Sequence, residues 1–284
     1  MEPMTAASQM PADLTIHPRN LRFQSTMPAN RWWLGGDPVA TALYNSLSVT
    51  FPEGEKFFID AVAHYRDRTP EPLRSQITAF ARQEGAHTRE HMTFNNHVTK
   101  AGYDLSAMDA RTEARTDFGR TRWSLPRLGA TAALEHFTAI LAHEALVRPE
   151  HFDGAPDEIR RMWRWHAIEE IEHKAVAFDT FLVAAAKLPA IRRWIMRCLL
   201  MFGVTIQFAR SITANVADFL RQDGIEPKTM RRRALRYLFG EPGMLKHVLP
   251  AYFAYYRPGF HPWNRDDRAL IAGVDAELAT QVAA

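Results

Sequence analysis

Hydrophobic positions recur at helical spacing along nearly the whole chain, and no run of alternating β-branched residues indicates a strand. Clusters of proline and glycine divide this pattern into blocks. The blocks predict helices over residues 37–49, 52–66, 73–100, 125–146, 157–182, 190–221 and 228–238, with a short final helix after residue 264. Residues 101–116 form a polar segment between two of these blocks. The pattern therefore predicts an all-α protein.

The middle of the chain is predicted to form two helical hairpins in succession. Asp37 followed by Pro38 predicts the start of the first helix, because aspartate caps helices and proline is tolerated in their first turn. The segment DRTPEP (67–72) predicts the turn of the first hairpin, and residues 148–156 predict the turn of the second. Two hairpins joined in this way are the plan of a four-helix bundle.

Composition excludes several classes of protein. The 284 residues are 46% hydrophobic and 24% charged, which supports a buried core and excludes a disordered chain. The single cysteine, Cys198, excludes an internal disulfide and a cysteine-based zinc or iron–sulfur site, and it fits the cytoplasm. A net charge of +3 is too small to indicate a nucleic-acid partner. The first twenty residues lack the apolar segment of a signal peptide.

Each predicted hairpin carries a Glu-x-x-His motif on its second helix. The first motif is Glu84 with His87, and the second is Glu170 with His173. Residues three apart lie on the same side of a helix, so both side chains of each motif face one way. The same faces carry large apolar residues, which turns them toward the core. Metal coordination is an effective way to satisfy several buried ionisable groups together.

The two hairpins place a glutamate opposite each motif. In an antiparallel hairpin, residues equally far from the middle of the turn lie opposite each other. Counting from the middle of the first turn places Glu55 opposite Glu84, and counting from the middle of the second places the neighbour of Glu135 opposite Glu170. Apolar residues share the face of Glu55, whereas Glu53 lies on the other side of the helix. Glu144 lies opposite Glu135 on its helix and is the poorer candidate. One glutamate from each of two helices, with Glu-x-x-His from the other two, is the ligand set of di-iron and di-manganese carboxylate bundles.

His166 lies on the same helix face as Glu170 and His173 and is a seventh potential ligand. The alternative is that His166 supports a ligand or is merely buried. For the motifs themselves, the alternative is a set of solvated faces or salt bridges to nearby arginine and lysine residues. His91 is expected behind the ligands or in the pocket wall. Phe80 and Trp163 are expected to line a substrate pocket or to belong to the core.

Other ionisable residues near the motifs are expected to play no part in metal binding. Glu169 and Glu172 are expected to be exposed or to pair with arginines. His97, His136 and His143 point away from the motifs and are expected to be structural or exposed.

Several segments resemble one known family. They are FPEGEKFF (51–58), FARQEGAHTREH (80–91), ALEHFTAILAHE (133–144), WHAIEEIEHKAVAFD (165–179) and FHPW (260–263). They resemble the predicted metal-dependent hydrolases, a family of bacterial proteins with a ferritin-like fold. The resemblance implies a di-metal site at Glu55, Glu84, His87, Glu135, Glu170 and His173. The spacing of His166, Glu170 and His173 is also similar to that of the di-iron arylamine N-oxygenases.

We therefore predict a ferritin-like four-helix bundle with additional N- and C-terminal helices. The expected parts are a flexible N-terminal arm (1–30), the di-metal bundle (31–187) and a C-terminal helical extension packed on it (188–284). In the leading hypothesis Glu84 and Glu170 bridge two ions. One ion also binds Glu55 and His87, and the other binds Glu135 and His173, with His166 as a further ligand.

The leading functional hypothesis is a non-haem, oxygen-activating oxidoreductase that holds two iron ions and acts on a small organic substrate. It would need an electron donor. The alternatives are a metal-dependent hydrolase with a two-metal activated water, for which manganese or zinc also serves, and a metal-binding bundle without turnover.

The apolar segment 191–220 has three interpretations, namely a core helix, a homodimer face or a peripheral membrane contact. Arg197 and Gln207 interrupt residues 195–209, so we do not expect the segment to span a membrane.

Overall fold

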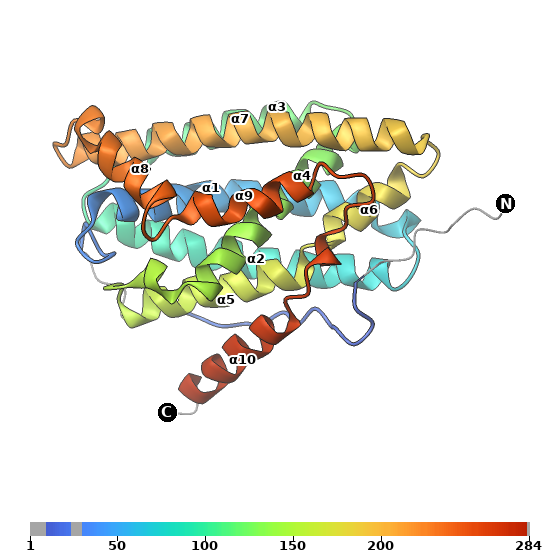
Figure 1. The fold of residues 1–284 in the computed structure, drawn as a ribbon, viewed down its shortest axis with the longest axis horizontal. Helices are drawn as coiled ribbons and strands as arrows, with labels where there is room; N and C mark the ends of the chain where they lie inside the picture. Colours follow the sequence, from blue (N-terminus) through green and yellow to red (C-terminus); the bar gives the residue numbers. More distant parts are fainter. Residues whose placement is uncertain (1–9, 24–29, 283–284) are drawn as a thin grey trace.

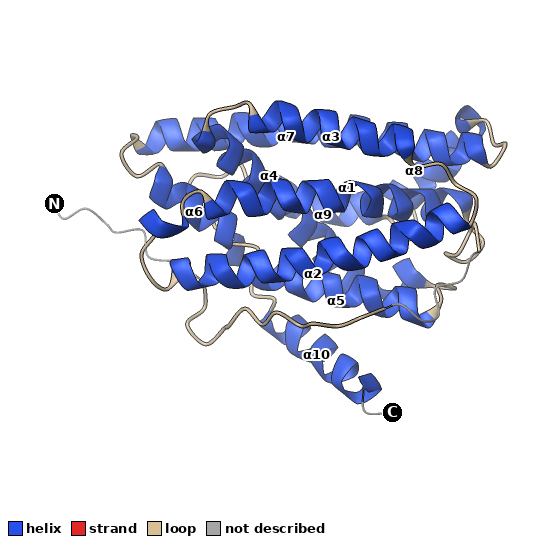
Figure 2. Cartoon of the chain, turned by 180° about the vertical axis from the view of Figure 1, so that it is seen from behind, coloured by secondary structure: helices blue, strands red, loops and turns tan. Residues whose placement is uncertain are grey.

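The computed structural model describes residues 10–23 and 30–282, and these residues form α-helices and short 3₁₀ turns with no strand (Figure 2). The prediction of an all-α protein is confirmed. The α-helices are α1 (Pro38–Ala63), α2 (Leu73–Lys100), α3 (Ser106–Arg120), α4 (Ser124–Val147), α5 (Asp157–His173), α6 (Val176–Ala184), α7 (Ala190–Gln222), α8 (Arg231–Phe239), α9 (Met244–Ala254) and α10 (Arg268–Val282).

Four long helices enclose the centre of the molecule. Helix α1 packs against α2, and α4 packs against α5, which gives the two predicted hairpins. Contacts of α1 with α4, and of α2 with α5, close the ring. Helix α7 lies along α1 and α4 at one edge of the molecule, and α10 packs on α5 near the opposite edge (Figure 1). Helix α9 covers α4.

Helix α1 is continuous, so the predicted break at Pro52 is wrong. Its N-terminus is the predicted one, because Asp37 Oδ1 accepts hydrogen bonds from the backbone N–H groups of Val39 and Ala40. Proline cannot donate to the carbonyl four residues earlier, which is that of Ser48. Asn95 on α2 supplies the missing donor, since its Nδ2 lies 3.2 Å from the Ser48 carbonyl oxygen. The partner helix thus compensates for the proline.

Two further boundaries differ from the prediction. The polar segment 101–116 contains most of α3, whose buried side chains form a narrow stripe of Met108, Thr112 and Thr116. The predicted helix over residues 157–182 is divided into α5 and α6 at Lys174 and Ala175. Lys174 lies at this break, and its buried ammonium group donates a hydrogen bond of 2.6 Å to Asp267 Oδ2.

The described part of the N-terminal segment is not a loose arm, which corrects the prediction for residues 10–23. The backbone N–H of Arg19 donates to Glu169 Oε1 at 2.8 Å, and that of Phe23 donates to Glu90 Oε2 at 3.0 Å. The Phe23 side chain is buried. The segment therefore packs on α2 and α5. Residues 1–9 and 24–29 of the predicted arm lie outside the described residues.

Helix α7 is long and apolar enough to cross a membrane by length and composition alone, contrary to the expectation for residues 195–209. Its most apolar 18-residue window has a mean hydropathy of 1.4, and only 17% of that window is buried. Met201, Ile212 and Phe219 are among the side chains that α7 buries. One side of the helix therefore packs on the bundle, and the other faces outward.

Candidate metal centre

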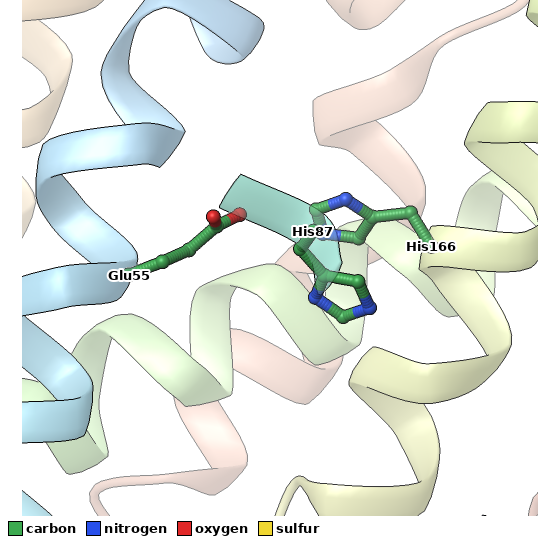
Figure 3. Close-up of side chains that lie close together, drawn as sticks. All are labelled: Glu55, His87 and His166. Atoms are coloured by element: carbon green, nitrogen blue, oxygen red, sulfur yellow. The ribbon is translucent and has the colours of Figure 1, made fainter. Parts of the chain in front are cut away.

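The seven residues predicted as ligands are all buried and converge at the centre of the four long helices. Their exposed fractions are 4% or less. Their candidate ligand atoms fall into two groups, and within each group the atoms lie within 4.8 Å of one another. The first group contains Glu55 from α1, His87 from α2 and His166 from α5 (Figure 3). The second contains Glu84, Glu135, Glu170 and His173.

The grouping differs from the hypothesis at one residue. His166 lies with Glu55 and His87, not with Glu135 and His173. The rings of His166 and His87 are stacked with centroids 4.2 Å apart. One turn of α5 separates His166 from Glu170, and this step along the helix axis carries the imidazole to the other group.

Glu84 and Glu170 lie between the two groups. Glu84 Oε2 lies 3.7 Å from His87 Nδ1, while its Oε1 lies 3.2 Å from His173 Nε2. Glu170 Oε1 lies 3.4 Å from His87 Nδ1, 3.5 Å from His173 Nε2 and 3.0 Å from His166 Nε2. Each of these carboxylates therefore faces imidazoles of both groups.

Many polar atoms at the centre are buried without a hydrogen-bond partner in the part of the chain that the structure describes. They include both carboxylate oxygens of Glu84 and of Glu135, one oxygen each of Glu55 and Glu170, His87 Nδ1 and His173 Nε2. An unsatisfied buried polar atom costs about 1–3 kcal/mol, and more if it is charged. The unpartnered atoms are oxygens and imidazole nitrogens, which are the donors that metal ions such as iron, manganese and zinc accept. The residues therefore fit a metal centre.

Polar side chains behind the site orient two of the imidazoles. His87 Nε2 lies 3.0 Å from Glu169 Oε2, which leaves Nδ1 facing the centre. His173 Nδ1 donates to Gln83 Oε1 at 3.0 Å, which leaves Nε2 facing the centre. The amide of Gln83 is held in turn, because its Nε2 donates to Glu172 Oε2 at 2.7 Å. Hydrogen bonds of this kind fix the tautomer and ring orientation of metal-binding histidines.

A chain of hydrogen bonds sets the tautomer of His166. The Ser48 hydroxyl donates to Asn95 Oδ1 at 2.7 Å, so Ser48 Oγ accepts from His91 Nδ1 at 2.9 Å. His91 Nε2 then accepts from His166 Nδ1 at 2.6 Å. Burial lowers the pKa of His91, and it lowers the pKa of His166 to about 4, so both rings are neutral at pH 7. The unprotonated His166 Nε2 faces Glu170 Oε1, a pairing of lone pairs that a cation would stabilise.

The carboxylates strongly influence one another's ionisation. Burial raises the pKa of Glu55 and of Glu135 well above the ordinary range, and the neighbouring Glu84 raises it further. Burial and the charge of Glu170 also raise the pKa of Glu84. Burial opposes ionisation of Glu170, but the positive charge of His173, whose own pKa Glu170 raises, outweighs burial and holds the pKa of Glu170 well below the usual value. Like charges in a buried space favour protonation unless a cation compensates them.

The expectation that Glu169 and Glu172 are exposed is wrong, and the alternative that they pair with arginine is confirmed. Both are buried, and Arg19 forms ion pairs with each of them. The role of Glu169 behind His87 was not predicted, because the spacing of residues along α5 does not reveal which of its outer carboxylates reaches α2. Gln83 was missed because a glutamine next to the motif gives no distinct signal.

The remaining predicted residues lie at different distances from the centre. His91 lies directly behind His166, as expected. Phe80 packs edge-on against His173, with ring centroids 4.8 Å apart. Trp163 packs against His91 and borders a cavity. His136 and His143 bind elsewhere, to the Ala251 carbonyl and to Asp267.

An apolar cavity of about 380 Å³ adjoins the candidate metal centre. His166 and Glu170 form part of its wall, and side chains of α1, α3, α4 and α7 form much of the remainder. Its volume is within the range of small-molecule pockets. The cavity would therefore bring an apolar molecule next to the clustered carboxylates and imidazoles.

Buried carboxylates and imidazoles gathered inside a helical bundle define a candidate metalloprotein. The chain belongs to the predicted metal-dependent hydrolase family, whose model matches residues 17–266. No curated protein and no solved structure matches the chain. The family and the two buried His/Glu groups agree in pointing to metal-dependent chemistry.

Proposed function

We propose that the protein is an enzyme that works with two metal ions. One ion would bind Glu55, His87 and His166, and the other would bind Glu135 and His173. Glu84 and Glu170 would bridge them. The observation that carries this proposal is the set of buried carboxylate oxygens and imidazole nitrogens that have no hydrogen-bond partner among the described residues.

The arrangement of the ligands supports a ferritin-like bundle. Helices α1 and α4 each contribute one glutamate, and α2 and α5 each contribute a Glu-x-x-His motif. This distribution over four enclosing helices is that of the di-metal carboxylate proteins. Iron, manganese and zinc all accept this set of oxygen and nitrogen donors.

The reaction we propose first is metal-dependent hydrolysis of a small organic substrate, in agreement with the family. A bound metal pair supplies a nucleophilic water and polarises the group to be cleaved. The chain itself orients the imidazoles of His87 and His173 through Glu169 and Gln83, and it fixes the tautomer of His166 through His91. The apolar cavity would admit the substrate beside His166 and Glu170.

One observation favours oxygen activation as a second candidate. His166 adds a third, neutral imidazole to the four carboxylates, and the cavity beside it is largely apolar. A neutral imidazole adds a donor atom without adding negative charge, which suits an iron pair that must change oxidation state, and hydrolysis needs no such change. In this case the metal is iron, and an electron donor is required.

Metal loading with two parallel assays tests the proposal. The purified protein is stripped of metal and reloaded with zinc, manganese or ferrous iron. The zinc and manganese forms are assayed anaerobically against a panel of esters and amides, and the iron form is assayed for oxygen uptake with a reductant. Anaerobic turnover supports hydrolysis, and reductant-dependent oxygen uptake supports the second candidate. Metal binding without either activity would contradict both and favour a non-catalytic bundle.

A further inference from the structure

The cavity beside the candidate metal centre has chemically different side chains at two places. His166 and Glu170 border it at the metal centre, while Arg122 and Arg127 border it near the start of α4. Arg127 lies eight residues before Glu135 on α4, a distance of about 12 Å along the helix axis. Arg115 also borders the cavity, but at a different level of the bundle, beside Ser211 of α7.

Among the described residues, no carboxylate forms an ion pair with any of these three arginines. Arg115 donates to the Ser211 hydroxyl, and Arg122 lies over the ring of Phe118, 4.0 Å from its centroid. Arg127 Nε is buried and has no hydrogen-bond partner. Burial lowers the pKa of Arg115, since no acidic group offsets the loss of water. Arginine side chains in this state are available to an anion from outside the chain.

Two neighbouring arginines of α3 form ion pairs with carboxylates of the chain instead. Arg111 pairs with Asp218, and Arg120 pairs with Asp117. Neither of them borders the cavity. The arginines that border the cavity are therefore the ones whose charge the protein leaves uncompensated.

The wall between the two places is apolar. Aromatic and aliphatic side chains from α1, α4 and α7 form it, among them Phe57, Leu134, Phe137, Leu200 and Val204. A small polar substrate would leave this surface in contact with water. A flexible aliphatic chain would cover it and gain the free energy of apolar burial.

We propose that the cavity binds an amphiphile with one aliphatic chain and one carboxylate head group. The head group pairs with Arg122 and Arg127, and the chain extends along the apolar wall toward His166 and Glu170. Guanidinium groups bind carboxylates through paired hydrogen bonds, which favours an anionic head over a neutral or cationic one. The assignment of this ligand as the substrate rests on the proposed function, whereas its binding does not.

Calorimetric titration with molecules that share one chain tests the proposal. Metal-free and zinc-loaded protein is titrated with dodecanoate, dodecanol and dodecyltrimethylammonium below their micellar concentrations. Dodecanoate is expected to bind about tenfold more tightly than dodecanol, and the ammonium compound should bind most weakly. Dodecyl phosphate in a further arm distinguishes a carboxylate site from a phosphate site. Tighter binding of the phosphate would overturn the assignment of the head group.

Arginine variants identify the place that holds the head group. The double variant Arg122→Gln, Arg127→Gln should lose about tenfold or more in affinity for dodecanoate and keep its affinity for dodecanol. Arg120→Gln is the matched control on α3 and should bind both as the wild type does. Arg122→Gln changes a more exposed side chain and serves if the double variant fails to fold. Equal binding of dodecanoate and dodecanol by the wild type, or an unchanged affinity in the variants, would overturn the proposal.

The titrations separate this proposal from the proposed function. Dodecanoate binding by a protein that takes up neither zinc, manganese nor iron would leave the cavity assignment standing and overturn the metal enzyme. Zinc uptake without selective dodecanoate binding would overturn the cavity assignment and leave the metal enzyme standing.

The outward face of α7 carries a second, independent inference. Ile191, Ile195, Leu199, Phe202 and Ile206 form one stripe at helical spacing, and each is between 44% and 66% exposed. Single exposed apolar residues are ordinary, but a continuous stripe of five marks an interaction surface.

The charge around this stripe has one sign. The sequence contains no aspartate or glutamate from residue 187 to residue 217, whereas Lys187, Arg192, Arg193 and Arg210 lie in this range. A second copy of the chain packed on the same face would bring these cations together. An anionic lipid surface would attract them and would also accept the apolar side chains.

We infer that α7 rests on the surface of a membrane that contains anionic lipid. The other side of the helix packs on α1 and α4, so the helix lies along the membrane and does not cross it. The inference does not depend on the cavity ligand or on the metal centre.

Co-sedimentation with lipid vesicles tests this inference. The protein is expected to sediment with vesicles of phosphatidylcholine and phosphatidylglycerol, and to remain in solution with pure phosphatidylcholine or at high salt. Ile195→Gln, Phe202→Gln should reduce vesicle binding about tenfold or more. The control Met92→Gln, Val147→Gln changes two exposed apolar residues elsewhere and should have no effect. Absence of vesicle binding, or a dimer in light scattering that the α7 variant abolishes, would overturn the inference.

Discussion

At the scale of single residues, two glutamates on α1 lie in opposite environments. Glu55 is 2% exposed, and its Oε2 accepts a hydrogen bond from Thr88 Oγ1 at 2.7 Å while its Oε1 has no partner among the described residues. The Glu53 side chain is a third exposed and pairs with Lys56 at 2.6 Å. A rotation of about 200° separates them on the helix, so one faces the candidate metal centre and the other faces solvent.

Substitution of these two residues tests the α1 ligand. Glu55→Gln should reduce the metal content or weaken metal affinity by at least about tenfold, because an amide lacks the charge of a carboxylate. Glu53→Gln should leave metal binding unchanged. Metal analysis by mass spectrometry after dialysis compares the two. Equal retention of metal in both variants would show that Glu55 is not a ligand.

A second residue-scale prediction concerns Glu169, which orients His87 without facing the centre itself. Removing such a partner costs about 10- to 100-fold in metal affinity in other metalloproteins. Glu169→Gln should therefore weaken zinc binding about 10-fold or more in a chelator competition. Glu158→Gln, at the start of α5, is the control. An unchanged zinc affinity in a folded Glu169→Gln protein would contradict the role of this contact.

At the scale of helices, the sequence predicts those helices that have a long apolar face, and it fails where local signals conflict with contacts from elsewhere in the fold. Helices α2, α4 and α7 have long periodic patterns, and their predicted limits are close to those observed. Helix α3 was missed because its buried stripe contains one methionine and two threonines. The continuity of α1 through Pro52 depends on Asn95 of another helix, which no local pattern reveals.

The same distinction applies to the candidate site. The helical periodicity and the positions of residues relative to each hairpin turn indicate which carboxylates and imidazoles face inward. The structure brings all seven predicted ligand residues together. The grouping of His166 and the contacts of Gln83 and Glu169 depend on how far each helix is displaced along its neighbour. That displacement is a property of packing, so it could not be read from the spacing of residues.

The connection before α10 is held to α4 and to the α5–α6 break by one buried carboxylate. Asp267 receives hydrogen bonds from Lys174 Nζ at 2.6 Å and from His143 Nδ1 at 2.9 Å. Burial opposes its ionisation, but these contacts and Arg265 outweigh it and hold the pKa of Asp267 well below the usual value. Because this pKa is lower in the folded state, the stabilisation is present above about pH 4 and is lost as the pH falls further.

Asp267→Asn should lower the free energy of unfolding at pH 7 by about 3 kcal/mol, because it leaves the buried Lys174 charge without its partner. The difference from the wild type should narrow as the pH falls below about 4, because the wild-type carboxylate then takes up a proton when the protein unfolds. Urea denaturation over this pH range measures both effects. Asp266→Asn, at the exposed neighbour, is the control and should show no comparable loss. A pH-independent difference would contradict the role of ionisation.

At the scale of the whole molecule, the candidate metal centre couples four helices through like charges. Four buried carboxylates converge from α1, α2, α4 and α5, and without a cation they repel one another or take up protons. A bound metal ion would relieve this repulsion and stabilise the folded state by mass action. The bundle should therefore depend on metal for part of its stability.

Removal of metal by chelation should lower the melting temperature by about 5–10 °C relative to protein with metal at about 100 times its dissociation constant. Readdition of metal should restore it. Glu84→Gln, Glu170→Gln should melt at one temperature with and without metal, since the bridging charges are absent. Calorimetry measures each form after the metal content has been verified. A wild-type melting temperature that does not change on metal removal would contradict the coupling.

If Glu84 and Glu170 bridge two metal ions in one chain, the stoichiometry of bound metal shows it most directly. Wild-type protein loaded with zinc or iron and freed of excess metal should contain two ions per chain. The variant Glu84→Ala, Glu170→Ala should remain helical by circular dichroism and retain little metal. Glu53→Ala, Glu150→Ala removes two carboxylates away from the centre and should keep two ions. A Glu84→Ala, Glu170→Ala protein that still binds two ions per chain would contradict this assignment.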